Sequence, residues 1–208
     1  MVLYLSGAVR REVLEEPGFG FLLTPRMGNR FIKGAIWAAD TGCFSQPQDF
    51  HLAKYLRWLD SKCCGPRADC LFVNAPDVLE DHAATLERAL PVLPQLRAAG
   101  WKASFVAQNG ATIDNVPWDE LDGIFIGGDS EWKESRAAAS LIHEGRRRGK
   151  HTHVGRVNAP ERLMYAARAG AHSVDGTRIA FGFNENWPLL REWVRCLRGQ
   201  QSFSFLAD

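Results

Sequence analysis

The chain has 208 residues, 46% of them hydrophobic, which suits one domain, residues 1–208, with a sizeable core. A formal net charge of +1 excludes a protein that is basic overall, so any nucleic-acid-binding surface must be local. The 5 cysteines include an adjacent pair and lack a C-x-x-C spacing, which indicates reduced thiols rather than a disulfide framework or a structural zinc site. The N-terminal apolar run is too short for a signal peptide and no stretch approaches a membrane span, so we expect a cytoplasmic protein without a membrane partner.

Short β-rich runs recur along the chain, each bounded by glycine, proline or polar residues. The predicted strands are Val2–Ser6, Phe19–Thr24, Gly34–Ala39, Cys70–Asn74, Ala103–Ala107, Gly123–Ile126, His151–Val157 and Ala171–Val174, with Phe181–Phe183 as one further candidate. A basic loop, Pro25–Lys33, lies between the second and third runs.

Helical patterns separate most of these runs. The predicted helices cover 49–63, about 79–99, 131–148, a segment that ends at Gly170, and 187–198. Pro91 and Pro94 predict a break within the second helix. Asn158 and Glu161 have the spacing of a capping pair for the helix that ends at Gly170.

The alternation of strands and helices predicts a compact (β/α)8-type TIM barrel, either complete or incomplete, with irregular N-terminal strands. Such barrels usually need about 250 residues, so this one must have short connections. An open, doubly wound sheet remains the alternative fold.

Polar residues and glycines follow the predicted strands at their C-terminal ends. They are Asp40, Asp77, Gln108, Gly127, Gly128, Arg156 and Asp175. In a parallel barrel these positions converge on the face that holds active sites. Carboxylates accept hydrogen bonds from N–H groups, an amide does both, and glycines let a flat ring approach the backbone. The set therefore predicts a pocket for a planar, hydrogen-bonding ring.

Each of these residues also has an ordinary structural explanation. Asp40 and Asp175 stand before turn residues, Asp77 could cap a helix, and Gln108 lies in a turn sequence. The Arg146-Arg147-Arg148 run ends a helix just before a strand, hence at the opposite end of the barrel, where helix-dipole pairing and solvation explain it. The histidines show no metal-ligand spacing, so no metal is predicted.

Four short segments carry a family resemblance: DTGCFSQ at 40–46, AQNG at 107–110, IGG at 126–128 and AGAHSVDGTR at 169–178. In this order they resemble the D-S-G-G-F-Q, V-Q-G-G, G-G and nucleophile segments of the tRNA-guanine transglycosylase superfamily. The resemblance is strongest to the superfamily's DNA-acting phage and bacterial relatives, the deazapurine DNA-modification transglycosylases.

The resemblance implies a glycosyltransferase that replaces guanine in DNA with a 7-deazaguanine such as preQ0 and needs no cofactor. Asp175 matches the nucleophile, whose carboxylate attacks C1′ and holds the deoxyribose covalently while guanine leaves. Asp40 matches the general base that deprotonates the incoming base.

The same resemblance implies roles for the rest of the pocket. Asp77 would bind the Watson–Crick edge of guanine. Gln108 and the backbone of Gly127 and Gly128 would hold the carbonyl side of the ring, and Phe44 would stack on the base.

Departures from the family favour DNA over tRNA as substrate. Members that act on tRNA carry a late C-x-C-x-x-C plus His zinc cluster, whereas here only Cys196 lies beyond Cys70. We expect no RNA-binding appendage after the barrel. Asp129-Ser130-Glu131 replace the usual small apolar residues after the Gly-Gly pair, which leaves the base preference open, and the segment around Asp77 matches poorly.

The expected partners are DNA and a free 7-deazaguanine base, in the host cytoplasm if the chain is phage-encoded; a homo-oligomer stays open. Arg156, Arg162 and Arg178 are the predicted phosphate contacts, with Lys133 close by. The competing hypotheses are a tRNA-guanine transglycosylase, a catalytically silent nucleobase- or nucleic-acid-binding barrel subunit, and a TIM-barrel enzyme of unrelated chemistry.

Overall fold

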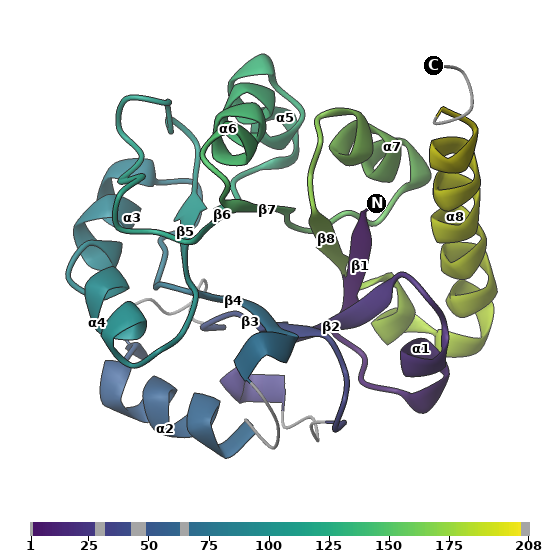
Figure 1. Cartoon of the computed structure of the whole chain (residues 1–208), viewed down its shortest axis with the longest axis horizontal. Helices are drawn as coiled ribbons and strands as arrows, with labels where there is room; N and C mark the ends of the chain where they lie inside the picture. Colours follow the sequence, from purple (N-terminus) through teal and green to yellow (C-terminus); the bar gives the residue numbers. More distant parts are fainter. Residues whose placement is uncertain (1, 28–31, 43–48, 63–66, 205–208) are drawn as a thin grey trace.

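A computed structural model describes residues 2–27, 32–42, 49–62 and 67–204, and it is a closed barrel of eight parallel strands (Figure 1). The strands are β1 (Leu3–Ser6), β2 (Phe19–Leu23), β3 (Trp37–Ala39), β4 (Cys70–Asn74), β5 (Ala103–Ala107), β6 (Gly123–Ile126), β7 (His151–Val154) and β8 (Ser173–Gly176). They pair in chain order, and β8 pairs with β1. The predicted TIM barrel is confirmed, and the open sheet is excluded.

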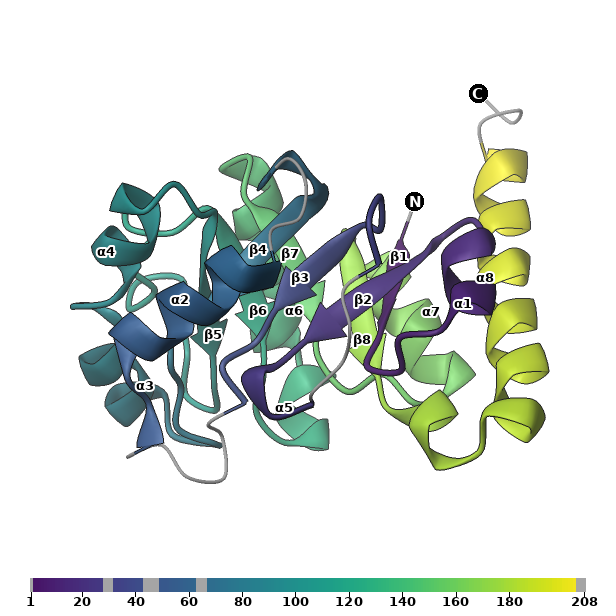
Figure 2. The same cartoon turned by 90° about the horizontal axis from the view of Figure 1, so that it is seen from below.

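Helices surround this barrel, as Figures 1 and 2 show. They are α1 (Arg11–Glu15), α2 (Leu52–Lys62), α3 (His82–Ala89), α4 (Leu93–Ala98), α5 (Ser130–Lys133), α6 (Arg136–Arg147), α7 (Pro160–Arg168) and α8 (Phe183–Ser204), with short 3-10 turns η1 (Pro25–Met27), η3 (Arg67–Asp69) and η4 (Arg178–Phe181). No helix in the described part of the chain is long and apolar enough to cross a membrane.

Two apolar layers hold the barrel together. The outer layer packs helix residues such as Leu96, Leu141 and Leu190 against the strands. Inside the barrel, the ring of Phe72 on β4 contacts the rings of Phe125 on β6 and His153 on β7. Because β4 is not adjacent to β6 or β7, these contacts cross the barrel interior. The carboxyl end of the barrel is therefore closed from below by side chains and can hold a pocket rather than a pore.

The N-terminal strands are irregular, as expected, and the reason lies in β3. Only Trp37–Ala39 pair as a strand, whereas Gly34–Ala39 were predicted. The pairing of β3 with β4 shifts register between Trp37 and Ala39. Asp40 follows directly, and its backbone N–H donates to Leu23 O (2.9 Å), which fixes the chain as it leaves the strand.

Several local predictions were wrong. The helix expected over 131–148 is two helices, because the Ser135 side chain caps α6 by accepting from the N–H of Ala138. Residues Arg178–Phe181 form a 3-10 turn where a strand through Phe183 was considered. The expected break at Pro91 and Pro94 is confirmed, since α3 ends at Ala89 and α4 begins at Leu93.

The capping pair predicted for α7 is also wrong. Ala159 is the N-cap and no side chain caps the helix. The Asn158 side chain instead accepts hydrogen bonds from the N–H groups of Thr177 (2.8 Å) and Arg178 (3.1 Å), so it ties the loop after β7 to the loop after β8. A loop-to-loop bond of this kind cannot be told from a helix cap by sequence spacing alone.

Candidate active site

A cavity of about 370 Å³ opens at the carboxyl ends of the strands. Residues at the ends of all eight strands line it, from Gly7 after β1 to Thr177 after β8. The prediction that the strand-end residues share one pocket is confirmed for Asp40, Asp77, Gln108, Gly127, Gly128, Arg156 and Asp175. Phe44 lies outside the described residues.

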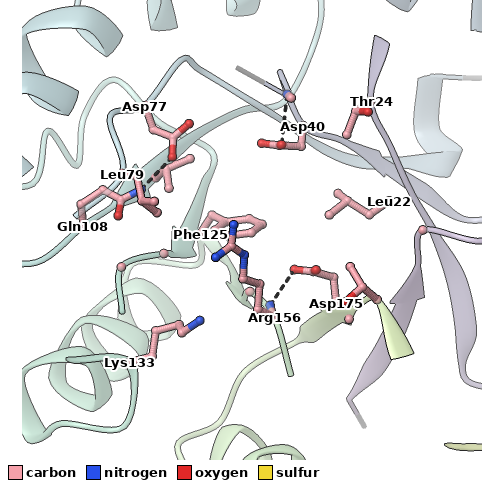
Figure 3. A pocket seen from close by; sticks show the side chains of 18 of the residues that line it. Leu22, Thr24, Asp40, Asp77, Leu79, Gln108, Phe125, Lys133, Arg156 and Asp175 are labelled. Carbon is pink, nitrogen blue, oxygen red and sulfur yellow. Dashed lines mark hydrogen bonds between the residues drawn. The ribbon is translucent and has the colours of Figure 1, made fainter. Parts of the chain in front are cut away.

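Asp40 and Asp77 lie on one side of this pocket, and Lys133, Arg156 and Asp175 lie on the other (Figure 3). We call the side formed by Asp40, Asp77 and Gln108 the acidic wall. We call the side formed by Lys133, Arg156 and Asp175 the cationic wall, because it carries the cations Lys133 and Arg156 as well as Asp175. The two walls place hydrogen-bond acceptors and donors on either side of one cavity.

Asp175 is held in place from below by a histidine. It lies within β8 itself, one residue further into the sheet than predicted. His153 Nε2 lies 2.9 Å from Asp175 Oδ1, and the backbone N–H of Arg156 donates to the same oxygen (3.3 Å). An ionised carboxylate only accepts, so His153 donates through Nε2. Both hydrogen bonds are accepted by Oδ1, which leaves Oδ2 as the oxygen available for attack.

A chain of buried hydrogen bonds continues from His153 into the barrel. Ser173 Oγ lies 2.7 Å from His153 Nδ1 and 2.8 Å from His151 Nε2. Because His153 uses its N–H on Asp175, its Nδ1 accepts from the Ser173 hydroxyl, and Ser173 in turn accepts from His151. Burial lowers the pKa of His151 to about 3, so that ring is neutral. The chain gives His153 one tautomer and one orientation.

Asp40 on the acidic wall is held by amide donors. Asn74 Nδ2 donates to its Oδ1 (2.9 Å), and the N–H of Gly42 donates to its Oδ2 (3.1 Å). Burial raises the pKa of Asp40 above its ordinary value, and the nearby charge of Asp175 raises it further, against the lowering effect of the Asn74 hydrogen bond. A raised pKa makes the Asp40 carboxylate a stronger base than an exposed one.

Asp77 is buried beside Gln108. Gln108 Nε2 donates to Asp77 Oδ2 (2.7 Å), and Gln108 Oε1 accepts from the N–H of Glu80 (2.9 Å). Burial raises the pKa of Asp77 to about 7, with the charge of Asp40 adding to the effect. Gln108 is therefore held between Asp77 and Glu80, and it orients the Asp77 carboxylate.

The floor and one side of the pocket need glycine. A Cβ at Gly155 would lie 2.6 Å from the ring of Phe125, and Gly128 has a φ of +79° with Asn109 Oδ1 2.4 Å from its would-be Cβ. Any larger residue would push these groups into the cavity. The glycine backbone and the ring of Phe125 line the pocket and can contact a flat ligand.

The predicted phosphate contacts separate into two groups. Arg156 lines the pocket, and Arg162 lines an adjoining crevice, where it pairs with Glu134 (2.8 Å). Arg178 lines neither: its guanidinium packs on the ring of Trp193 and donates to Asn158 O (3.3 Å). Lys133, noted only as a neighbour, points into the pocket (Figure 3).

The Arg146-Arg147-Arg148 run serves the fold, as expected. Arg147 and Arg148 both bind Glu144, and Arg146 donates to Gly170 O (2.7 Å). Within the described residues, no group of three or more His, Cys, Asp or Glu side chains could hold a metal ion.

His153 and Asn74 are the site residues that sequence reasoning missed. Both lie within strands, Asn74 after the apolar run of β4 and His153 in the polar sequence HTHV of β7, and a buried polar side chain is the only signal of a role. Such a residue is buried at a cost unless a partner satisfies it, so the signal indicates a hydrogen bond but not its partner.

No protein-family model matches the chain, and no curated protein matches it. Among solved structures, it is similar to the Bacillus subtilis YkuI protein with an EAL domain, in complex with c-di-GMP and calcium, at 15% identity and a TM-score of 0.42, over 68% of this chain and 36% of that one. It is also similar to the PaMucR phosphodiesterase in complex with c-di-GMP, at 15% identity and a TM-score of 0.44, over 67% and 58% of the two chains.

A third similar structure is the EAL domain of FimX from Pseudomonas aeruginosa bound to c-di-GMP, at 19% identity and a TM-score of 0.42, over 69% of this chain and 60% of that one. The matched region spans less than two thirds of the length of each of these three chains. Similarity at this level assigns neither a substrate nor a reaction to the chain.

Proposed function

We propose that this barrel is a base-exchange transglycosylase that replaces guanine in DNA with a 7-deazaguanine base, in the manner of the tRNA-guanine transglycosylase superfamily. The observation that carries the proposal is the pair of carboxylates Asp175 and Asp40 on opposite walls of one pocket, each with its own hydrogen-bond partners. Base exchange needs two carboxylates with different tasks, one to bond to the sugar and one to move a proton.

In the first half-reaction, Asp175 Oδ2 attacks C1′ of the target deoxyguanosine. The new O–C1′ bond forms as the bond from C1′ to N9 of guanine breaks, and guanine leaves with that electron pair and takes up a proton from solvent water. His153 and the N–H of Arg156 hold the other carboxylate oxygen, so the attacking oxygen keeps a fixed direction.

In the second half-reaction, a free 7-deazaguanine occupies the place of guanine. Asp40 takes the proton from the ring nitrogen of the incoming base, that nitrogen bonds to C1′, and Asp175 leaves as a carboxylate. Asp77, oriented by Gln108, accepts hydrogen bonds from the N–H groups of the base edge in both halves.

The target guanosine must leave the base stack to reach Asp175, because the pocket lies at the end of a closed barrel. Extrusion of a base from a duplex costs a few kcal/mol, so single-stranded or mismatched sites should react faster. DNA is preferred to tRNA as the proposed substrate because the cysteines of the family's zinc cluster are absent from the sequence.

The test is incorporation of labelled guanine into three substrates: single-stranded DNA, duplex DNA and tRNA. The proposal expects label in DNA from the wild-type protein and none from Asp175→Asn, since an amide is a far weaker nucleophile of similar size. Asp119→Asn, which changes an exposed carboxylate before β6, is the matched control and should exchange normally. Label in tRNA alone would reassign the substrate, and label in none of the three would contradict the proposal.

A further inference from the structure

Lys133 is a buried cation that nothing in the proposed chemistry uses. The residue is only 6% exposed, and its ammonium group neither donates a hydrogen bond to a described residue nor forms an ion pair with one. Figure 3 shows the side chain reaching from α5 toward the pocket, on the same side as Arg156. Because Lys133 lines the pocket, its ammonium group can donate hydrogen bonds to an anion bound there.

The acids nearest to Lys133 are committed to other partners. Asp129 caps α5 by accepting from the N–H of Trp132 (2.8 Å). Glu134 forms its ion pair with Arg162 (2.8 Å). Asp175 attracts the ammonium at a distance, but its Oδ1 accepts from His153. Asp175 is therefore the carboxylate whose charge acts most strongly on Lys133, and none of the three forms a direct hydrogen bond or ion pair with its ammonium group in the described part of the chain.

Two further cations, Arg156 and Arg162, lie near Lys133. Burial lowers the pKa of Lys133 below its ordinary value, the charge of Asp175 opposes this shift, and the charges of Arg156 and Arg162 add to it. Lys133, Gly155 and Arg156 line the main pocket and also an adjoining crevice that contains Arg162 and Tyr165. The three cations thus follow one path that leads out of the pocket beside Asp175.

We infer that this path is an anion subsite that binds a backbone phosphate next to the target nucleotide, with the Lys133 ammonium as its buried contact and Arg156 and Arg162 along its exit. The identity of the bound base rests on the proposed function, whereas the binding of an anion rests on the positions of the three cations. It makes the substrate class a phosphorylated nucleotide within a strand rather than a free nucleoside. A phosphate has several acceptor oxygens and a negative charge, which suits a cluster of three cations.

The same geometry excludes Arg178 from this path. Its guanidinium packs on Trp193 and lines neither the pocket nor the crevice. Phosphates should therefore leave the pocket on the α5 and α7 side and not over α8.

The test compares binding of deoxyguanosine, deoxyguanosine 3′,5′-bisphosphate and inorganic phosphate to the wild-type protein and to Lys133→Met, by calorimetry at fixed ionic strength. We expect the bisphosphate to bind the wild type about 10- to 100-fold more tightly than the nucleoside. Lys133→Met should lose most of this preference while binding deoxyguanosine as the wild type does. Lys150→Met removes a lysine at the opposite end of the barrel, where it donates to Leu121 O, and should keep the preference.

A thermal unfolding measurement shows that Lys133→Met folds. The variant should unfold at a higher temperature than the wild type, because it removes an unpartnered buried charge. An unchanged preference for the bisphosphate in a folded Lys133→Met protein would overturn the inference. Lys133-dependent binding of inorganic phosphate without binding of deoxyguanosine would support the anion subsite and contradict the proposed base, so the two failures are distinguishable.

Discussion

The two walls of the pocket differ in what holds their carboxylates. On the cationic wall, Asp175 is anchored by an imidazole and a backbone N–H, with Lys133 and Arg156 beside it. On the acidic wall, Asp40 and Asp77 are anchored by the neutral amides of Asn74 and Gln108. On the acidic wall, burial raises the pKa of Asp40 and Asp77 and a nearby carboxylate adds to the shift, against the lowering effect of the two amide hydrogen bonds.

This difference assigns the roles in the proposed reaction. A carboxylate fixed through one oxygen is suited to attack with the other, which is the task given to Asp175. Two acids whose pKa values are raised by burial are suited to handle the protons of a nucleobase, which is the task given to Asp40 and Asp77.

Among changes that distinguish the roles of the two walls, replacement of Asp40 should have the largest effect on guanine exchange. Asp40→Asn keeps the shape and the Gly42 contact but removes the base, so guanine exchange should fall by about 10²- to 10⁴-fold. The covalent protein–DNA species should still form, because Asp175 is unchanged. Labelled-guanine exchange and a denaturing gel measure the two steps separately, and equal loss of both would show that Asp40 acts before the covalent step.

Changes below Asp175 should have a smaller effect. Ser173→Ala removes the hydroxyl that holds His153, so the imidazole loses its fixed tautomer and Asp175 its fixed orientation. We expect kcat for exchange to fall by up to about 100-fold with KM nearly unchanged, because the defect is one of position. Ser140→Ala, at an exposed hydroxyl on α6, is the matched control. A change in KM alone would argue against a positioning role.

The pKa of Asp77 predicts a pH dependence of stability. Its folded value, about 7, lies above the ordinary value of 3.8, so the folded protein holds this proton more tightly than the unfolded chain. The free energy of unfolding should therefore fall as pH rises from about 4 to 7, by at most about 1.4 kcal/mol per pH unit from this group. Urea titrations across this range should show a shallower fall for Asp77→Asn and an unchanged one for Asp119→Asn. An equally steep fall in Asp77→Asn would place the titrating group elsewhere.

The smallest expected effect is on DNA binding, and it distinguishes Arg162 from Arg178, which the sequence predicted equally as phosphate contacts. Arg162→Ala should weaken DNA binding and reduce the salt slope by about 1, because it removes one phosphate contact. Arg178→Ala should leave that slope unchanged and lower stability instead, since this side chain packs on Trp193 and holds the Asn158 carbonyl. Binding isotherms at several salt concentrations check both, and a reduced slope for Arg178→Ala would contradict the exit path on the α5 and α7 side.

The sequence predicted the fold and most of the pocket because both follow from strand ends. Apolar runs followed by polar residues placed Asp40, Asp77 and Gln108 correctly, since a parallel barrel brings every strand end to one face. The register of β3 and the break at Ser135 could not be predicted. The register depends on pairing with β4 and the break depends on a capping hydrogen bond, and the local sequence allows these contacts without requiring them.

The partners of the site residues were beyond sequence reasoning. The contact between His153 and Asp175 joins two strands and depends on which face each side chain takes. Lys133 belongs to the pocket only because α5 stops after four residues and turns its side chain inward. Asn158 has the spacing of a cap and serves as a tie between loops. In each case the local sequence permits more than one arrangement of similar free energy, and tertiary contacts select one of them.

The nucleophile can be identified by locating the covalent bond. Wild-type protein is incubated with a guanine-containing oligonucleotide, denatured and digested, and the peptide that carries the deoxyribose is sequenced by mass spectrometry. The proposed mechanism predicts a modification on Asp175, and no adduct with Asp175→Asn. An adduct on another residue, or one that persists in Asp175→Asn, would contradict the assignment of Asp175 as the group that holds the sugar.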